Sequence, residues 1–202
     1  MMGRRSETMA ETREKLIAAA RKTFAARGFV DSPMEDITAE AGLTRGALYH
    51  QFGGKKGLLE AVIEKIDAEM TERLSVISSR ATSTWAALID ELVAYVAMAA
   101  EPEIQRIVLL DGPAVLGEPS QWPTQIACVR NTRRHIERLI EEGVVQPVDA
   151  EATARLVSAA ALGASLWVAN SEDPHVSSRR VSESLPVLLS GLLVRDPQVG
   201  GQ

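Results

Sequence analysis

The chain has 202 residues, of which 46% are hydrophobic and only 4% aromatic, a composition rich in alanine and leucine that favours helices over strands. The net charge of −5 argues against a protein that binds a polyanion over its whole surface, and the single cysteine, Cys128, excludes an internal disulfide and is expected to be a small core residue. No run of eighteen apolar residues and no charged-then-apolar leader occurs, which predicts a cytoplasmic protein with no membrane partner.

The first predicted helix begins at the capping box Thr8–Glu11 and ends at Gly28, with Phe29 folding back on its last turn. Its apolar residues recur at helical spacing. They are Leu16, Ile17, Ala20 and Phe24.

Residues 1–7 show no periodicity and contain Arg4 and Arg5, so they are predicted to form a flexible basic arm. Two interpretations stay open for this arm. It contacts a DNA phosphate or the minor groove, or it is a terminus without a role.

The stretch Met34–Phe52 predicts two short helices joined by a tight turn at Ala41–Gly42. A second capping box, Ser32–Glu35, starts the first of them, and Thr44 caps the second. The apolar residues that pack the pair together are expected to be Ile37, Ala41, Leu43, Leu48 and Phe52. The second helix then presents polar side chains to solvent, as a recognition helix that enters the major groove does.

This stretch resembles the DNA-binding signature of the TetR family of one-component regulators. The resemblance covers Ile37–Phe52 and the following Lys55 and Leu58–Leu59, about the first quarter of the chain, and combines a helix-turn-helix with the aromatic pair Tyr49 and Phe52. It implies contacts to the DNA backbone from four residues. They are Thr38, Tyr49, His50 and Lys55.

The start of the recognition helix is where side chains reach base edges. Thr44 and Arg45 lie there, and the arginine fork suits guanine O6 and N7. Gly46 and Ala47 are small enough to let the helix approach the groove closely.

Gly53–Gly54 breaks this helix, and a long helix is predicted from Lys55 to about Arg80. Lys55 and Lys56 in its first turn oppose the helix dipole, by a few tenths up to about 1 kcal/mol each. A DNA phosphate against both lysines would compensate that cost, whereas a solvated surface pair is the simpler alternative.

The rest of the chain predicts further helices. Their expected ranges are 84–100, 103–110, 123–142, 150–169 and 177–194. The last two are rich in small and apolar residues, which predicts a helical pair that packs against a second copy of the chain. Packing inside one subunit is the alternative. Pro186 is expected to kink the last helix.

Large adaptable side chains on these helices are candidates for an apolar small-molecule pocket, although such residues also form ordinary cores. They are Trp85, Tyr95, Met98, Trp122 and Trp167. A pocket in this region is otherwise implied only by the resemblance. No metal-binding, phosphate-loop or dinucleotide-binding motif occurs, so neither a cofactor nor a metal is expected.

The charge of the chain is unevenly distributed between its N-terminal part and the remainder. Residues 1–57 carry ten Lys/Arg and seven Asp/Glu (+3), and the remainder carries twelve and twenty (−8), which together give the net −5. A basic head on an acidic body suits a protein that touches DNA with one end.

The sequence therefore predicts an all-α protein with a DNA-binding helix-turn-helix domain at residues 1–54 and a helical effector-binding and dimerisation domain at 55–202, beginning with the long linking helix. The predicted function is that of a homodimeric transcriptional repressor, not an enzyme, released from double-stranded operator DNA by a small apolar effector. A constitutive DNA-binding dimer without an effector and a helical enzyme are the alternatives.

Overall fold

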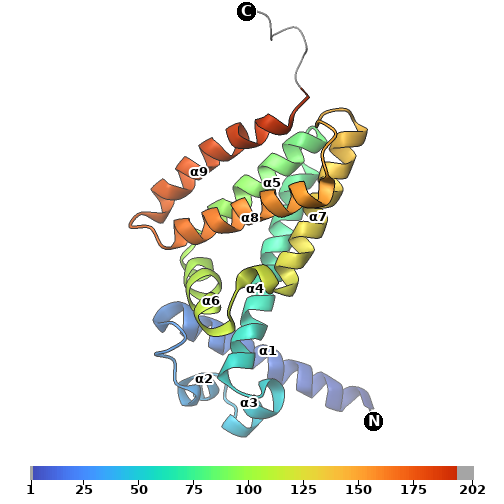
Figure 1. The fold of residues 1–202 in the computed structure, drawn as a ribbon. Coiled ribbons are helices and arrows are strands. Elements are labelled where there is room, and N and C mark those ends of the chain that lie inside the picture. Colours follow the sequence, from blue (N-terminus) through green and yellow to red (C-terminus); the bar gives the residue numbers. More distant parts are fainter. Residues whose placement is uncertain (1, 195–202) are drawn as a thin grey trace, which may run out of the picture. The chain divides into compact units, whose positions relative to one another are not determined.

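The computed structural model describes the backbone of residues 2–194 and the side chains of residues 9–194. Over this range the chain folds into nine α-helices, a π-helical segment and two short 3₁₀ turns (Figure 1). The one strand-like pairing among these residues is an isolated antiparallel bridge between Val145 and Leu193. The predicted all-α fold with about nine helices is confirmed.

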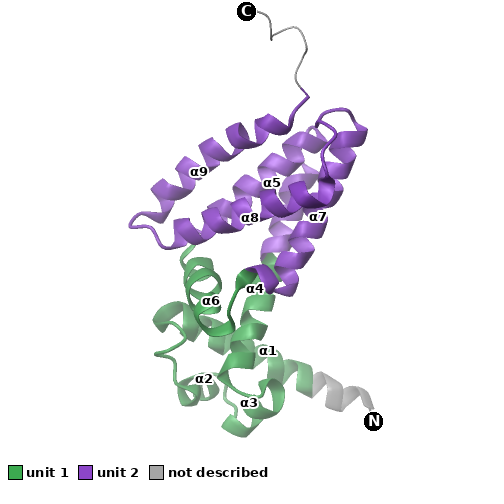
Figure 2. Cartoon of the chain, in the orientation of Figure 1, with its two compact units in different colours: residues 1–69, 101–119 green, residues 70–100, 120–202 purple. Residues whose placement is uncertain are grey.

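The chain divides into two compact units, shown in Figure 2. Residues 1–69 and 101–119 form the first, and residues 70–100 and 120–202 form the second. The first unit thus contains more than the predicted head, because a segment from the middle of the sequence joins it. The functional boundary between residues 54 and 55 stays a prediction.

The first unit is built on α1, which packs against α2, α3 and η1. The apolar face predicted for α1 is buried at all four positions, as are Ile37 of α2 and Leu48 of α3. Phe29 packs on Phe24 with ring centroids 5.6 Å apart, as expected for a chain that folds back after Gly28. The helices are α1 (Met2–Arg27), α2 (Met34–Glu40), α3 (Arg45–Phe52), the start of α4 (Lys55–Ser79), η1 (Ile104–Asp111) and α6 (Gly112–Leu116).

Hydrogen bonds and ion pairs fasten the segment 101–119 to α1 and the turn after it. Arg21 donates to both oxygens of Glu103, at 2.7 Å each, and also to both oxygens of Glu69 on α4, at 2.7 and 2.8 Å. Asp111 Oδ2 accepts from the backbone N–H of Phe29 at 2.7 Å. The head is therefore completed by residues about eighty positions further along the chain.

The predicted starts of α1, α2 and α9 (Pro174–Leu189) were wrong. Helix α1 begins at Met2, not at Thr8, so the predicted arm is helical and Thr8 is not an N-cap. Between these positions Gly3 is the one poor helix former, and nothing in the sequence stops the helix. The side chains of Arg4 and Arg5 lie outside the described residues.

Helix α2 also begins differently. Its N-cap is Pro33, which makes no side-chain capping bond. Ser32, expected to be the cap, is fully buried, and its hydroxyl donates to the carbonyl of Gly28 instead. The left-handed turn at Gly28 (φ 79°) brings this carbonyl within reach, a tertiary feature that local sequence does not reveal.

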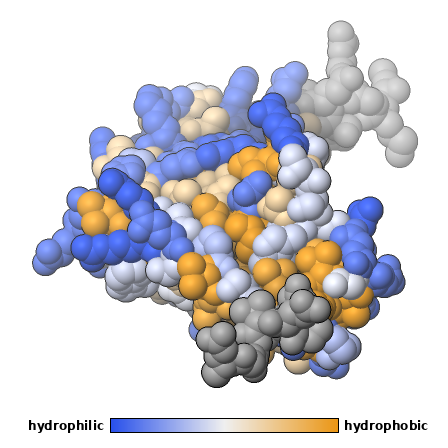
Figure 3. All heavy atoms as spheres, turned by 90° about the horizontal axis from the view of Figure 1, so that it is seen from above, coloured by the Kyte–Doolittle hydropathy of each residue, from blue (hydrophilic) through white to orange (hydrophobic). Residues whose placement is uncertain are grey.

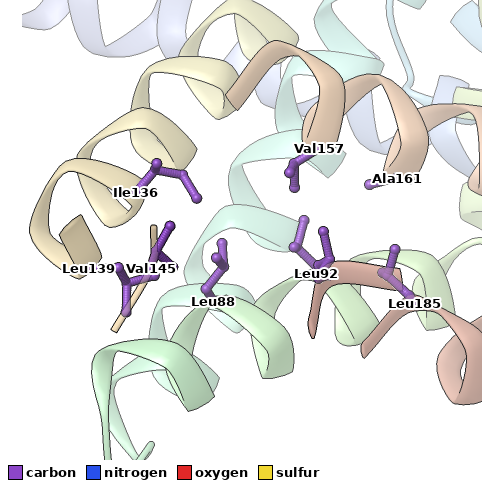
Figure 4. Packing of buried hydrophobic residues seen from close by; sticks show 9 residues of the cluster. Leu88, Leu92, Ile136, Leu139, Val145, Val157, Ala161 and Leu185 are labelled. Atoms are coloured by element: carbon purple, nitrogen blue, oxygen red, sulfur yellow. The ribbon is translucent and has the colours of Figure 1, made fainter. Parts of the chain in front are cut away.

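In the second unit α5 packs against α7, α8 and α9. Their buried side chains form one core, which includes Leu88 of α5, Ile136 of α7 and Val157 of α8 (Figure 4). The elements of this unit are the end of α4, α5 (Thr84–Met98), α7 (Pro123–Glu141), α8 (Ala150–Ala169), α9 (Pro174–Leu189) and η3 (Ser190–Leu192), with the 3₁₀ turn η2 (Pro119–Gln121) leading into α7.

Helix α9 starts three residues before the prediction. Asp173 caps it by accepting from the N–H of Val176 at 2.9 Å, and Pro174 occupies the first turn. Pro186 lies inside this helix, which continues to Leu189.

Helix α8 is, among the described residues, the one helix long and apolar enough to cross a membrane by length and composition. A single such helix is weak evidence, because core helices pass the same test. Of the apolar 18-residue window of α8, 39% is buried, including Ala154, Val157 and Ala161.

Candidate nucleic-acid interface and ligand cavity

Helix α3 has the build predicted for a recognition helix. Thr44 caps it, accepting from the N–H of Ala47 at 3.2 Å, and Gly53 ends it in the left-handed conformation (φ 71°). Leu48 anchors the helix in the first unit. The side opposite Leu48 faces solvent. Its exposed residues are Thr44, Arg45, Gly46, Tyr49 and His50, and Ala47 is half-buried among them.

Arg45 contacts two neighbouring side chains. Its Nη1 lies 2.7 Å from Oε1 of Glu35 on α2, and its guanidinium lies 5.6 Å from the ring centroid of Tyr49. All three side chains are exposed. The predicted base-reading arginine therefore lies at the surface, paired with an acidic residue that was not expected as its partner from the sequence. Nothing in the local pattern marks Glu35, because it lies ten residues earlier on another helix.

Lys55 and Lys56 differ although they are adjacent. Lys56 is exposed. Lys55 Nζ donates to the carbonyl of Val30 at 3.3 Å and lies 4.5 Å from the ring centroid of Phe29. Burial lowers the pKa of Lys55, against the opposing effect of nearby aspartates. Lys55 thus ties α4 to the turn after α1 in addition to carrying charge.

Thr38 is buried, and its hydroxyl donates to the carbonyl of Glu35 at 3.1 Å. Thr38 therefore lies on the buried side of α2, away from solvent. Its predicted contact to the DNA backbone stays a prediction, which would require α2 to present its hydroxyl differently.

The second unit contains a small cavity of about 40 Å³, room for a few water molecules. Residues of α4, α5, α7 and α8 surround it. They are Leu74, Glu91, Leu92, Tyr95, Gln125, Cys128, Thr132, Ser158 and Ala161. Cys128, expected in the core, is half-buried and lines this cavity.

Of the five residues predicted to bind a ligand, Tyr95 lines the cavity, and its hydroxyl accepts from Gln125 Nε2 at 2.9 Å. The structure does not bring the other four to it. Trp85 packs against the hydrophobic core, Met98 is buried, and Trp167 is 51% exposed. Trp122 is half-buried, and its indole N–H is buried with no hydrogen-bond partner.

Sequence reasoning missed the polar side of the cavity, because Glu91, Gln125, Thr132 and Ser158 form no local motif. Glu91 Oε1 accepts from Asn131 Nδ2 at 3.1 Å, and Oε2 lies 3.9 Å from His135 Nδ1. Burial raises the pKa of the Glu91 carboxyl, partly offset by His135 and by the hydrogen bond from Asn131. Among the residues whose side chains are described, no cluster of three metal-ligating side chains occurs.

Apolar side chains also reach the surface, as Figure 3 shows for one face. On α8, Leu156 is 72% exposed and Trp167, about three helical turns further on the same side, is 51% exposed. On α9, Val187 and Leu188 are 72% and 67% exposed. Between Leu156 and Trp167 lie small exposed residues. They are Ala159, Ala160 and Gly163. These residues of α8 and α9 are named the α8–α9 stripe below, and none of the described residues buries them.

Comparison with known proteins agrees with this geometry. The model of bacterial regulatory proteins of the tetR family matches residues 16–62, and the model of the tetracyclin repressor-like C-terminal domain matches residues 85–192. A crystal structure of a TetR-family transcriptional regulator from Pectobacterium atrosepticum has 49% sequence identity and a TM-score of 0.86. The match covers 94% of this chain and 97% of that one.

Curated relatives match over shorter segments. The uncharacterized HTH-type transcriptional regulator TtgW of Pseudomonas putida is 30% identical over 106 residues, 50% of this chain and 75% of the relative. The regulator SrpR of the same species has the same identity over 47% of its length. The transcriptional repressor BepR of Brucella suis is 39% identical over 62 residues, 31% of this chain and 30% of the relative.

The first family model covers α2 and α3, which carry the helix-turn-helix, and the second runs from α5 to η3. Between them they cover most of each compact unit. This chain therefore belongs to the TetR family of helix-turn-helix transcriptional regulators.

Proposed function

We propose that this protein is a homodimeric repressor that binds double-stranded operator DNA through α3 and leaves it when a small molecule enters the cavity of the second unit. The observation that carries the proposal is the solvent-facing side of α3. There an arginine, a tyrosine and a histidine stand exposed around two small residues, on a helix anchored from behind by Leu48.

Each side chain has a part in DNA binding. Arg45 and Thr44 read base edges, Gly46 and Ala47 permit close approach, and Tyr49, His50 and Lys56 contact phosphates. Lys55 adds charge and also holds the first turn of α4 in place. Thr38 has a positioning role as long as it stays buried. Arg4 and Arg5 are proposed to contact phosphates from the start of α1.

The test is binding of the purified protein to the DNA upstream of its own gene, by fluorescence anisotropy over a range of salt concentrations. We expect specific binding about a thousandfold or more tighter than binding to random DNA, with a steep salt dependence. Equal affinity for both DNAs would contradict the proposal.

The second part of the proposal is the dimer. The α8–α9 stripe is an apolar surface of two adjacent helices, suited to pairing with the same two helices of another copy through a two-fold axis. Two recognition helices then read half-sites about 34 Å apart, or a multiple of that distance.

The third part is release by an effector. The cavity in the second unit provides a binding site, and regulators of this family typically respond to small molecules. A constitutive DNA-binding dimer is the alternative, and a screen for compounds that release the DNA separates the two. Relatives are transcriptional regulators rather than enzymes, and we propose no catalytic activity. We expect the protein in the cytoplasm, where such regulators generally act.

A further inference from the structure

The cavity of the second unit combines an apolar wall with a single negative charge. Leu74, Leu92 and Ala161 supply aliphatic surface. Glu91 is its carboxylate, and neither a lysine nor an arginine is among the described residues that line it. The other lining residues carry neutral polar groups.

The partners of Glu91 leave its charge incompletely compensated. Asn131 donates to Oε1 and Ser78 also hydrogen-bonds the carboxylate, and both are neutral partners. His135 Nδ1 lies 3.9 Å from Oε2, beyond hydrogen-bond reach, and supplies a positive charge only when it is protonated. This His135 nitrogen is itself buried without a hydrogen-bond partner. Among the described residues this half-buried carboxylate has no lysine or arginine partner, and burial raises its pKa.

No arginine of α7 pairs with Glu91. Arg130 and Arg134 are exposed and, with Arg133, line a separate hollow at the surface. Arg133 pairs with Glu137 at 2.9 Å and with Glu151 of α8 at 3.5 Å, and Arg138 pairs with Glu142 at 3.2 Å. These pairs occupy the charged side of α7, whereas Thr132 and Cys128 face the cavity.

We propose that the effector is a small organic cation, an amine on a short apolar body, whose ammonium group binds Glu91. This inference rests on the proposed function, in which an effector enters this cavity. An ammonium group has three N–H donors and forms a charge-assisted hydrogen bond with a carboxylate. A neutral alcohol would leave the charge of Glu91 uncompensated, and an anion would be repelled by it.

The size of the cavity limits the body of the ligand. About 40 Å³ accommodates a short chain or part of a ring, placed against Leu74, Leu92 and Ala161. Suitable probes are n-butylamine and benzylamine. Their matched controls are n-butanol and benzyl alcohol, which are neutral, and butyrate and benzoate, which are anions.

The test measures the affinity of the full-length protein for each probe by calorimetry, without DNA. We expect each amine to bind at least about tenfold more tightly than its alcohol, and the carboxylates to bind most weakly. Glu91→Gln keeps the shape of the side chain and removes its charge, so it should weaken amine binding by about ten- to a hundredfold. Glu141→Gln, the same change at an exposed position of α7, should leave amine binding unchanged.

Several outcomes would overturn the inference. One is equal binding of an amine and its matched alcohol, and another is an unchanged amine affinity in the Glu91→Gln variant. The third is the absence of binding of both n-butylamine and benzylamine. DNA binding is measured separately, without any probe. A protein that binds its own promoter but no amine remains a repressor with another class of effector, whereas one that binds amines but no DNA refutes the proposed function and keeps the cation site.

Discussion

Gly57 has no side chain, and this allows the first turn of α4 to lie close to the end of α3. A β-carbon on Gly57 would lie 2.1 Å from the carbonyl oxygen of Phe52, and this oxygen is backbone and cannot swing aside. Alanine would add up to about 1 kcal/mol of helix propensity. Overpacking costs about 1–3 kcal/mol, so the cost of the clash should exceed the gain in helix propensity. We expect Gly57→Ala to lower the free energy of unfolding by about 1–2 kcal/mol in urea titrations.

Gly46→Ala is the matched control. Its β-carbon would have only Thr44 Oγ1 nearby, at 3.8 Å, so the unfolding free energy should stay the same or rise. If α3 docks closely in the major groove, this variant should nevertheless bind operator DNA more weakly. Equal stability of Gly57→Ala and wild type would show that α4 can shift to accept the methyl group.

The two adjacent lysines should respond differently to replacement. Lys56→Ala should lower the slope of log affinity against log salt by about one on any DNA sequence, without changing stability. Lys55→Ala should do the same and also lower the free energy of unfolding, because Lys55 contacts Phe29 and the carbonyl of Val30. Anisotropy and urea denaturation check the two effects, and identical stability of both variants would contradict the packing role of Lys55.

Arg45→Ala should cost about 1–3 kcal/mol of binding free energy, mainly at the cognate site. The measurement compares operator with random DNA at one salt concentration. An equal loss on both would mean that Arg45 contacts phosphates rather than bases.

At the scale of elements, the sequence predicted the helix caps and helix ends that depend on neighbouring residues alone. The Thr44 cap, the Gly53 end of α3 and the start of α4 at Lys55 follow from signals within a few residues. Ser32 was misassigned because its partner, the Gly28 carbonyl, reaches it only once the turn has folded. The cavity was missed for the same reason, since Glu91, Gln125 and Ser158 meet only through helix packing.

Arg21 links three elements, and its partner Glu69 makes this link dependent on pH. Its hydrogen bonds lower the pKa of Glu69, so the stabilisation is present above the unfolded value of about 4.3 and is lost as the pH falls through the folded value below it. Glu69→Gln should therefore be less stable than wild type at neutral pH, and the difference should vanish in more acidic solution. Urea titrations at several pH values test this, and a difference independent of pH would contradict it.

The α8–α9 stripe can be tested with neighbouring residues. Leu188 is 67% exposed and Leu189 is 5% exposed, so the same substitution separates assembly from folding. Leu188→Glu should give a folded monomer by sedimentation and circular dichroism, whereas Leu189→Glu should destabilise the subunit itself. The predicted pairing of the last two helices with a second copy would include Leu189, but this residue is buried in the core of its own chain. A full-strength Leu188→Glu dimer would place the interface elsewhere.

At the scale of the whole molecule, α4 is the helix that contributes residues to both units. Its buried Leu58 and Leu59 belong to the first unit and Leu74 lines the cavity of the second. A ligand preference of about 1–3 kcal/mol between two positions of such a helix would weaken DNA binding about 5–150-fold. Operator DNA must then weaken ligand binding by the same factor. Calorimetry of an identified effector with and without operator tests this, and an unchanged affinity would rule out coupling.

The first unit also has a consequence for synthesis of the chain on the ribosome. Arg21 lacks Glu103, and the N–H of Phe29 lacks Asp111, until translation has passed residue 111. A nascent chain that exposes only α1 to α3 is therefore missing part of its packing. Closing the loop between residues 69 and 101 then costs conformational entropy, although that cost grows only slowly with loop length. A head cut out by a single break after residue 54 should accordingly be less stable than the same residues within the whole chain. Its use as a separate DNA-binding module would require the segments 55–69 and 101–119 as well.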